Sequence, residues 1–188
     1  MYLDDALLYN QGYMISINDL DSPLFYLFDY DSRSFKINMS FQHFHQFHEI
    51  HILLSGRASH IIEGDYYTLQ PYDIVLLRPS LLHSTEYPAG GDCRRLIINF
   101  RVPDDSPVLH EMLQSCLQPF GAEVPIYRFT GETRAQAFSH LNAIFTLGKQ
   151  PMTPLTQQFI HCHFLQFLAT VAQSRRSSAI PSPRRSTP

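Results

Sequence analysis

Five of the ten histidines in this chain of 188 residues lie between positions 43 and 60. His43, His45, Glu49 and His51 share one parity, so on an extended strand their side chains point to the same face. Imidazole nitrogen and carboxylate oxygen are ligands for zinc, iron, manganese, nickel and copper. Three interpretations are open: a divalent metal site, a metal-free pocket that hydrogen-bonds a small polar molecule, or a structural cluster that satisfies buried backbone groups.

Two later residues extend this candidate site. His83 follows Pro79 on a later predicted strand and can supply another ligand from there. Arg78 precedes Pro79, and its guanidinium can hold a carboxylate or sugar hydroxyls, or form a salt bridge with an acidic neighbour. The predicted ligand-binding residues are His43, His45, Glu49, His51, Arg78 and His83, and the candidate metal ligands among them are His43, His45, Glu49 and His83.

No catalytic residue is assigned, because the chain contains no GxSxG, HExxH, GxGxxG or P-loop motif. The only cofactor that the residues indicate is a divalent metal ion: zinc, iron, manganese, nickel or copper. Three further histidines, His60, His110 and His140, are expected to be structural or exposed. The candidate site is therefore a binding site, and a metal-dependent reaction is the alternative.

The elements that must position these residues are short strands. Between positions 23 and 102, short runs rich in Phe, Tyr, Ile and Leu alternate with turn residues. Ser55-Gly56 and Glu63-Gly64-Asp65 are predicted hairpin turns. Closely spaced strands with tight turns predict a sandwich or barrel. The predicted strands lie near 24–30, 35–40, 45–54, 58–63, 66–69, 73–78, 82–87 and 95–102.

A helical region is predicted over residues 103–174. Ser106-Pro107 reads as a helix start, and a second helix is expected from about Glu132 to Leu147. The third, from about Thr153, carries an apolar stripe at helical spacing, which could be core or a homodimer interface. We expect a homodimer formed through these helices. The stripe consists of Ile160, Phe164, Phe167, Leu168 and Val171.

The two ends of the chain differ in composition from the predicted strands and helices. Residues 1–22 read as a polar N-terminal arm, and residues 175–188, rich in Ser, Pro and Arg, as a disordered tail. The net charge of −3 gives no global basic surface for nucleic acid. The acidic N-terminus is no signal peptide, and no apolar run approaches the length of a membrane span. A cytoplasmic protein without membrane contact is expected.

The histidine segment resembles the first cupin motif, in which His-x-His is followed by Glu and then Gly. His43, His45, Glu49 and Gly56 match every position. The stretch from Gly64 to His83 resembles the second motif, with Pro79 and His83 in place. Here Ser80 and Tyr72 stand where glycine is common, and Tyr87 replaces the final Asn.

The run from His43 to Gly56, together with LQPYDIVLLRP (Leu69 to Pro79), looks like the N-terminal sensor domain of AraC-type transcription regulators. This resemblance implies a mainly β fold: a cupin-type double-stranded β-helix, or jelly-roll barrel, over 23–102, followed by two or three helices that dimerise. It also implies a small-molecule effector, such as a sugar, and no enzymatic activity.

AraC-type regulators carry a helix-turn-helix module after the sensor domain, and the residues after position 174 do not resemble one. We therefore expect no specific DNA binding by this chain alone. Two other functions stay open at this point. One is a metal-dependent cupin enzyme of the dioxygenase or isomerase type, and the other is a stand-alone sugar-binding cupin.

Overall fold

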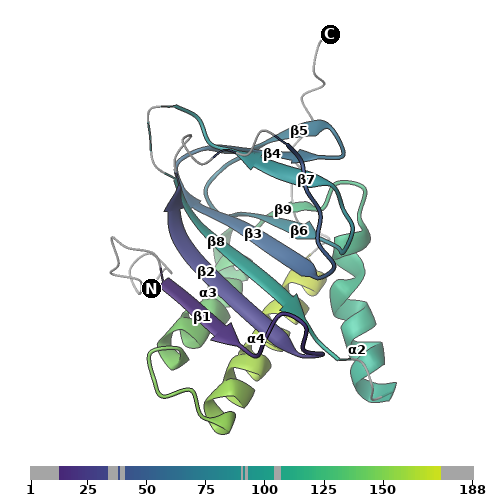
Figure 1. The fold of residues 1–188 in the computed structure, drawn as a ribbon, viewed down its shortest axis with the longest axis vertical. Helices are drawn as coiled ribbons and strands as arrows, with labels where there is room; N and C mark the ends of the chain where they lie inside the picture. Colours follow the sequence, from purple (N-terminus) through teal and green to yellow (C-terminus); the bar gives the residue numbers. More distant parts are fainter. Residues whose placement is uncertain are drawn as a thin grey trace.

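The computed structural model describes residues 13–33, 38, 41–89, 91, 93–103 and 107–174. Figure 1 shows strands in the first part of the chain and helices in the second. The strands are β1 (Tyr13–Ile17), β2 (Phe25–Arg33), β3 (His48–Ser55), β4 (Ala58–Ile62), β5 (Asp65–Leu69), β6 (Asp73–Leu77), β7 (His83–Glu86), β8 (Cys93–Arg101) and β9 (Ile126–Arg128). The helices are α2 (Pro107–Leu117), α3 (Gly131–Leu147) and α4 (Pro154–Gln173), with a short 3-10 helix η2 (Gln118–Gly121).

The described strands form two antiparallel sheets that face each other. The larger has the order β1-β2-β8-β3-β6-β9 and the smaller has the order β5-β4-β7. In Figure 1 the smaller sheet lies at the top, α3 and α4 lie behind the larger one, and α2 stands beside it at the lower right. Because non-consecutive strands are neighbours, this is a jelly-roll barrel of the predicted cupin type and not a simple meander.

The larger sheet has two different faces because side chains alternate along each strand. On β3, Ile50 and Ile52 face the helices and belong to the main apolar cluster. Glu49 and His51 face the smaller sheet, together with Leu53, which belongs to a second apolar cluster. The predicted parity is therefore correct on β3, and it divides an apolar face from a polar one.

Most predicted strands are confirmed, with one turn assigned wrongly. Glu63-Gly64 joins β4 to its partner β5 and has the positive φ angles of a tight hairpin. Ser55-Gly56 is not a hairpin, because β3 belongs to the larger sheet and β4 to the smaller one. The chain changes sheets at this turn. The strand predicted over 35–40 lies almost wholly outside the described residues.

The predicted region boundaries need two corrections. Part of the expected N-terminal arm, Tyr13–Ile17, is the edge strand β1 and pairs with β2. Part of the expected helical region, Ile126–Arg128, is strand β9 and pairs with β6. Burial alternates along β1, whereas β9 has only three residues, of which the first two are buried. Each strand is too short for an unambiguous sequence signal. Residues 1–12 and the predicted tail 175–188 lie outside the described residues.

The apolar stripe of α4 belongs to the core. Ile160, Phe164 and Phe167 are fully buried, with Phe164 packed edge-on against Phe28 of β2 and against Phe100 of β8. The stripe therefore cannot be the surface that a second copy would cover. Among the helices that the structure describes, none is long and apolar enough to span a membrane.

Candidate functional site

The segment that carries His43 and His45 crosses from one sheet to the other. His43 exchanges two backbone hydrogen bonds with His83 of the smaller sheet, with N···O distances of 2.8 and 2.9 Å. The backbone N–H of Ser80 donates to the His45 carbonyl at 2.8 Å, and β3 begins only at His48. The sequence analysis placed His45 on the same strand as Glu49. The structure instead brings the two together through this crossing.

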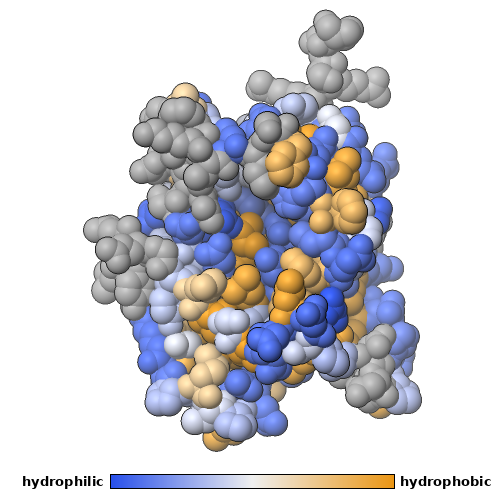
Figure 2. All heavy atoms as spheres, viewed as in Figure 1, coloured by the Kyte–Doolittle hydropathy of each residue, from blue (hydrophilic) through white to orange (hydrophobic). Residues whose placement is uncertain are grey.

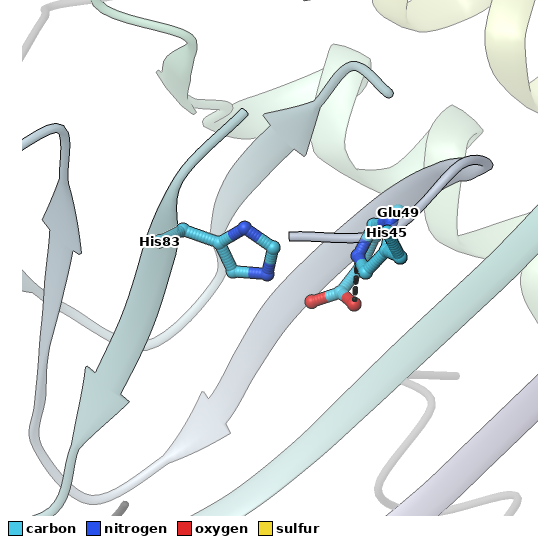
Figure 3. Close-up of side chains that lie close together, drawn as sticks. All are labelled: His45, Glu49 and His83. Atoms are coloured by element: carbon cyan, nitrogen blue, oxygen red, sulfur yellow. Dashed lines mark hydrogen bonds and ion pairs between the residues drawn. The ribbon is translucent and has the colours of Figure 1, made fainter. Parts of the chain in front are cut away.

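His45, Glu49 and His83 form a group that could hold a metal ion. Their ligand atoms all lie within 4.8 Å of one another, and His45 Nε2 is 3.1 Å from Glu49 Oε2. Figure 3 shows His83 reaching toward Glu49 and His45 from the opposite side. The ring of His43 lies 4.5 Å from that of His83 and 6.3 Å from that of His45, but His43 is not a member of this group.

The ring orientations favour Nε2 as the ligand atom of both histidines. His83 Nδ1 is 2.8 Å from the Leu81 carbonyl, and His45 Nδ1 is 2.9 Å from the Phe47 carbonyl. A carbonyl can only accept, so each Nδ1 carries a proton and donates it. The buried His83 Nε2 has no partner, and His45 Nε2 faces a carboxylate. Backbone carbonyls orient metal-binding histidines in this way, so the residues fit a zinc, iron, manganese, nickel or copper ion.

Burial controls the charge of these groups. It lowers the pKa of His83, and it lowers the pKa of His51 to about 4 with the help of the Arg95 charge. Burial alone would raise the pKa of Glu49, but the contact with His45 and the nearby imidazoles outweigh it and hold that pKa below its usual value. Near neutral pH the group therefore offers a carboxylate together with an uncharged His83.

A cavity of about 340 Å³ opens beside this group, between the two sheets. Figure 2 shows a recess on this face, with mostly hydrophilic residues around it and hydrophobic side chains inside. This volume is at the small end of the range for ligand pockets. The cavity is lined by Asp29, His43, Glu49, His51, His83, Thr85, Tyr87, Arg95, Ile97 and Asn99.

An ion pair lies on the larger-sheet side of the cavity. Arg95 Nη2 of β8 donates to Asp29 Oδ2 of β2 at 3.1 Å, and both residues line the cavity. Asn99, two positions beyond Ile97 on the same face of β8, has a buried side-chain oxygen without a partner. The cavity therefore combines charged, donor and acceptor groups on one wall.

The structure brings most of the predicted residues together. His43, Glu49, His51 and His83 line the cavity, and His45 joins Glu49 and His83 in the possible metal group. Arg78 lies outside the cavity: its side chain is exposed, and its guanidinium donates to the neighbouring Pro79 carbonyl at 3.4 Å.

The guanidinium that lines the cavity is Arg95, which the sequence analysis missed together with Asp29 and Asn99. The alternation on β8 was the available signal. Arg95, Ile97 and Asn99 share one parity, whereas the other parity of β8 is buried against the helices.

The two positions where the cupin motifs commonly have glycine adopt left-handed backbone conformations. Ser80 has a φ angle of 64° and Tyr72 has one of 72°. This conformation is one that glycine adopts without steric cost. The turns are thus preserved although the glycines are not, and Ser80 still holds the His45 backbone in place.

A family model for the AraC-like ligand-binding domain matches residues 36–147. The chain belongs to this family. The match covers strands β3 to β9 together with α2 and α3, so every residue that lines the cavity of this AraC-like ligand-binding domain lies in the matched region except Asp29 on β2. A search of curated proteins found no match.

Among solved structures, a cupin protein from Bacteroides fragilis is similar to the AraC-like domain, with 18% identity and a TM-score of 0.42 over 53% of this chain and 84% of that chain. A cupin-2 domain protein from Shewanella frigidimarina has 17% identity and a TM-score of 0.37, over 52% and 89% of the two chains. A cupin 2 conserved barrel domain protein from Salinispora arenicola has 18% identity and a TM-score of 0.38, over 53% and 79%.

Proposed function

We propose that this chain is the effector-sensing part of an AraC-type transcription regulator, and that its effector is a small polar molecule such as a sugar. The observation that carries this proposal is the cavity between the sheets. Its wall holds buried polar atoms without a partner in His51, His83 and Asn99. Such atoms cost free energy unless a bound molecule supplies the missing hydrogen bonds.

The charges of the cavity favour an uncharged effector. The Arg95 guanidinium is already paired with Asp29, and Glu49 is paired with His45. An anionic molecule would meet two carboxylates, and a cationic one would meet Arg95. Hydroxyl groups both donate and accept, so a polyhydroxylated molecule suits this mixed lining best.

The experiment compares Arg95, which lines the cavity, with Arg78, which lies outside it. The wild type, Arg95→Met and Arg78→Met are heated with a panel of pentoses and hexoses. A ligand at about 100 times its Kd raises the midpoint by roughly 5–10 °C in a domain of this size. We expect this shift for the wild type and Arg78→Met, and its loss in Arg95→Met. Asn99→Leu, which leaves the ion pair intact, should also weaken the shift.

A shift that survives in both Arg95→Met and Asn99→Leu would mean that the sugar binds elsewhere. The absence of any shift in the wild type would exclude the sugars of the panel as effectors.

A metal-dependent cupin enzyme is the second candidate, favoured by the arrangement of His45, Glu49 and His83. A metal ion bound there would polarise a substrate or bound water. The protein's metal content is measured after dialysis against a chelator, in the wild type and in His45→Ala combined with His83→Ala. Retained metal in the wild type and its loss in the double variant would support this candidate. A metal-free wild type with an intact fold would refute it.

We also propose a homodimer that uses the outer face of α4. Leu155, Phe159 and Cys162 follow one another at helical spacing and are exposed, Leu155 to 62% and Phe159 to 50%. An exposed apolar stripe on a helix is typical of an interface between copies. Cys162 extends the same stripe, so two paired helices would bring the cysteines of both copies near each other.

Sedimentation of the wild type should give twice the monomer mass, and Phe159→Glu should give the monomer. Met14→Glu is the matched control, because Met14 is exposed to 62% on β1, away from α4. A monomeric wild type, or a dimer that is lost only in Met14→Glu, would exclude this interface.

A further inference from the structure

His60 occupies a position where a core residue would be expected. It lies on β4, is fully buried and faces the larger sheet. Its Nδ1 is 3.0 Å from the Thr85 hydroxyl oxygen, whereas its Nε2 is buried without a partner. The sequence analysis expected a structural or exposed histidine. The structure shows a buried imidazole with one hydrogen-bonded nitrogen and one nitrogen without a partner.

A second imidazole approaches His60 from the opposite sheet. His51 of β3 is 1% exposed, and neither of its ring nitrogens has a partner. The two ring centroids are 5.4 Å apart. Neither histidine belongs to the group of His45, Glu49 and His83 that could hold a metal ion. We call these two residues the inner pair: His51 lines the cavity, whereas His60 is not among the lining residues and stacks its ring on that of His83, with centroids 5.9 Å apart.

The inner pair has apolar neighbours as well as polar ones. The same interior between the sheets contains Leu53, Ile62 and Val75, which are buried apolar residues of the second cluster. A buried polar group without a partner makes the folded protein less stable than an apolar group of similar shape would. In the free protein, two leucines would therefore be more stable at these positions than two histidines. Binding of a molecule that completes the hydrogen bonds would offset this cost.

The chemistry of the inner pair selects an uncharged partner. A neutral imidazole has one donor and one acceptor nitrogen, which matches a hydroxyl group. The Arg95 charge acts on His51 from one side and would repel a cation. The Glu49 carboxylate, two positions from His51 on the same face of β3, would repel an anion. An uncharged hydroxyl group is repelled by neither of these two charges.

We propose that His51 and His60 form an inner recognition subsite that binds a hydroxyl group of the ligand, next to the group of His45, Glu49 and His83. This inference rests on the proposed function of the cavity as an effector site. It assigns to His60 a role in specificity that neither the family match nor the cupin motifs provide.

The first experiment needs no ligand. Thermal unfolding is compared between the wild type, the double variant His51→Leu with His60→Leu, and the control His161→Leu. We expect the double variant to unfold at least about 4 °C higher than the wild type, because two unpartnered polar groups are removed. The control should unfold lower, because His161 Nδ1 hydrogen-bonds to the Tyr26 hydroxyl. A double variant that unfolds lower than the wild type would show that the inner pair is structural and would overturn the inference.

The second experiment follows the imidazole nitrogens by NMR in protein labelled with ¹⁵N histidine. A sugar of the panel that shifts the wild-type midpoint should move the signals of His51 and His60, and His60→Leu should weaken its binding at least tenfold. Equal binding by the wild type and His60→Leu, or binding only of sugar acids or amino sugars, would overturn the inference. If no sugar binds the wild type, the proposed sugar effector fails, and the unfolding experiment still decides the role of the inner pair.

Discussion

Two residues in left-handed backbone conformations should respond in opposite ways when they are changed to glycine. Ser80 and Tyr72 have φ angles of 64° and 72°. A left-handed conformation costs a residue with a Cβ roughly 1–2 kcal/mol, and glycine loses about 0.5–1 kcal/mol through its greater freedom in the unfolded chain. The backbone gain of each substitution is therefore about 0.5–1 kcal/mol. The side-chain contacts decide the sign.

The Ser80 side chain makes few contacts that a change to glycine would remove. Its hydroxyl contacts the exposed Gln46 side chain at 3.5 Å, and the hydrogen bond to the His45 carbonyl comes from its backbone N–H, which glycine retains. Ser80→Gly should therefore raise the free energy of unfolding by about 0.5–1 kcal/mol, or about 1–3 °C in the midpoint. Ser80→Ala keeps the backbone strain and should leave the stability unchanged.

Tyr72 has contacts that glycine cannot replace. Its ring packs edge-on against Phe138 of α3 at 5.4 Å, and the Arg134 guanidinium lies 4.7 Å above it. Loss of the aromatic pair, the cation–π contact and the apolar burial together costs roughly 2–3 kcal/mol. After the backbone gain, Tyr72→Gly should lower the free energy of unfolding by about 2 kcal/mol.

Equilibrium unfolding in urea measures all three variants against the wild type, with the dependence of the unfolding free energy on urea concentration held at one common value. A destabilised Ser80→Gly, or a Tyr72→Gly as stable as the wild type, would refute the assignment of backbone strain at these turns.

Three further predictions concern the packing around the barrel. Gly148→Ala should lower the stability by about 1–3 kcal/mol in urea unfolding, because its Cβ would lie 2.4 Å from Ile15 Cδ1; Gly148→Ala with Ile15→Val should recover part of the loss. Arg128→Met should lower it by about 3 kcal/mol, because fully buried Asp73 would lose both hydrogen bonds of 2.7 Å to the guanidinium; an unchanged midpoint would contradict this. Burial lowers the pKa of His161, so the unfolded chain takes up this proton at a higher pH than the folded protein does. The contribution of His161 to stability is therefore complete above about pH 6.5 and decreases as the pH falls below that value. The free energy of unfolding of His161→Phe should decrease less between pH 6.5 and 5 than that of the wild type.

The local patterns of the sequence were sufficient for the barrel and for half of the site. Alternation along β3 separates Glu49 and His51 from Ile50 and Ile52, and this period follows from the geometry of any strand. The Glu63-Gly64 turn is likewise a local property, because the two residues adopt positive φ angles. Such features depend only on neighbours in the chain, so they are readable without a structure.

Only the tertiary structure shows which residues from distant strands meet in the cavity. The Arg95–Asp29 pair joins residues 66 positions apart, and it exists because β8 pairs with β2. The order of the strands in a sheet depends on packing across the whole domain, so no local pattern shows it. The same reason explains why Arg95 and not Arg78 lines the cavity, and why the α4 stripe, which has the spacing of an interface, is core.

The histidine segment shows both contributions at once. The residue types of His43, His45, Glu49 and His51 pointed to a binding site, whereas their arrangement depends on the crossing from the smaller sheet to the larger one. His60 had no motif around it, and only the facing of β4 and β3 brings its ring to that of His51. The sequence by itself determined which chemistry is available in this protein. The packing of two sheets decided which groups meet, because contacts across a sandwich join segments that are distant in the chain.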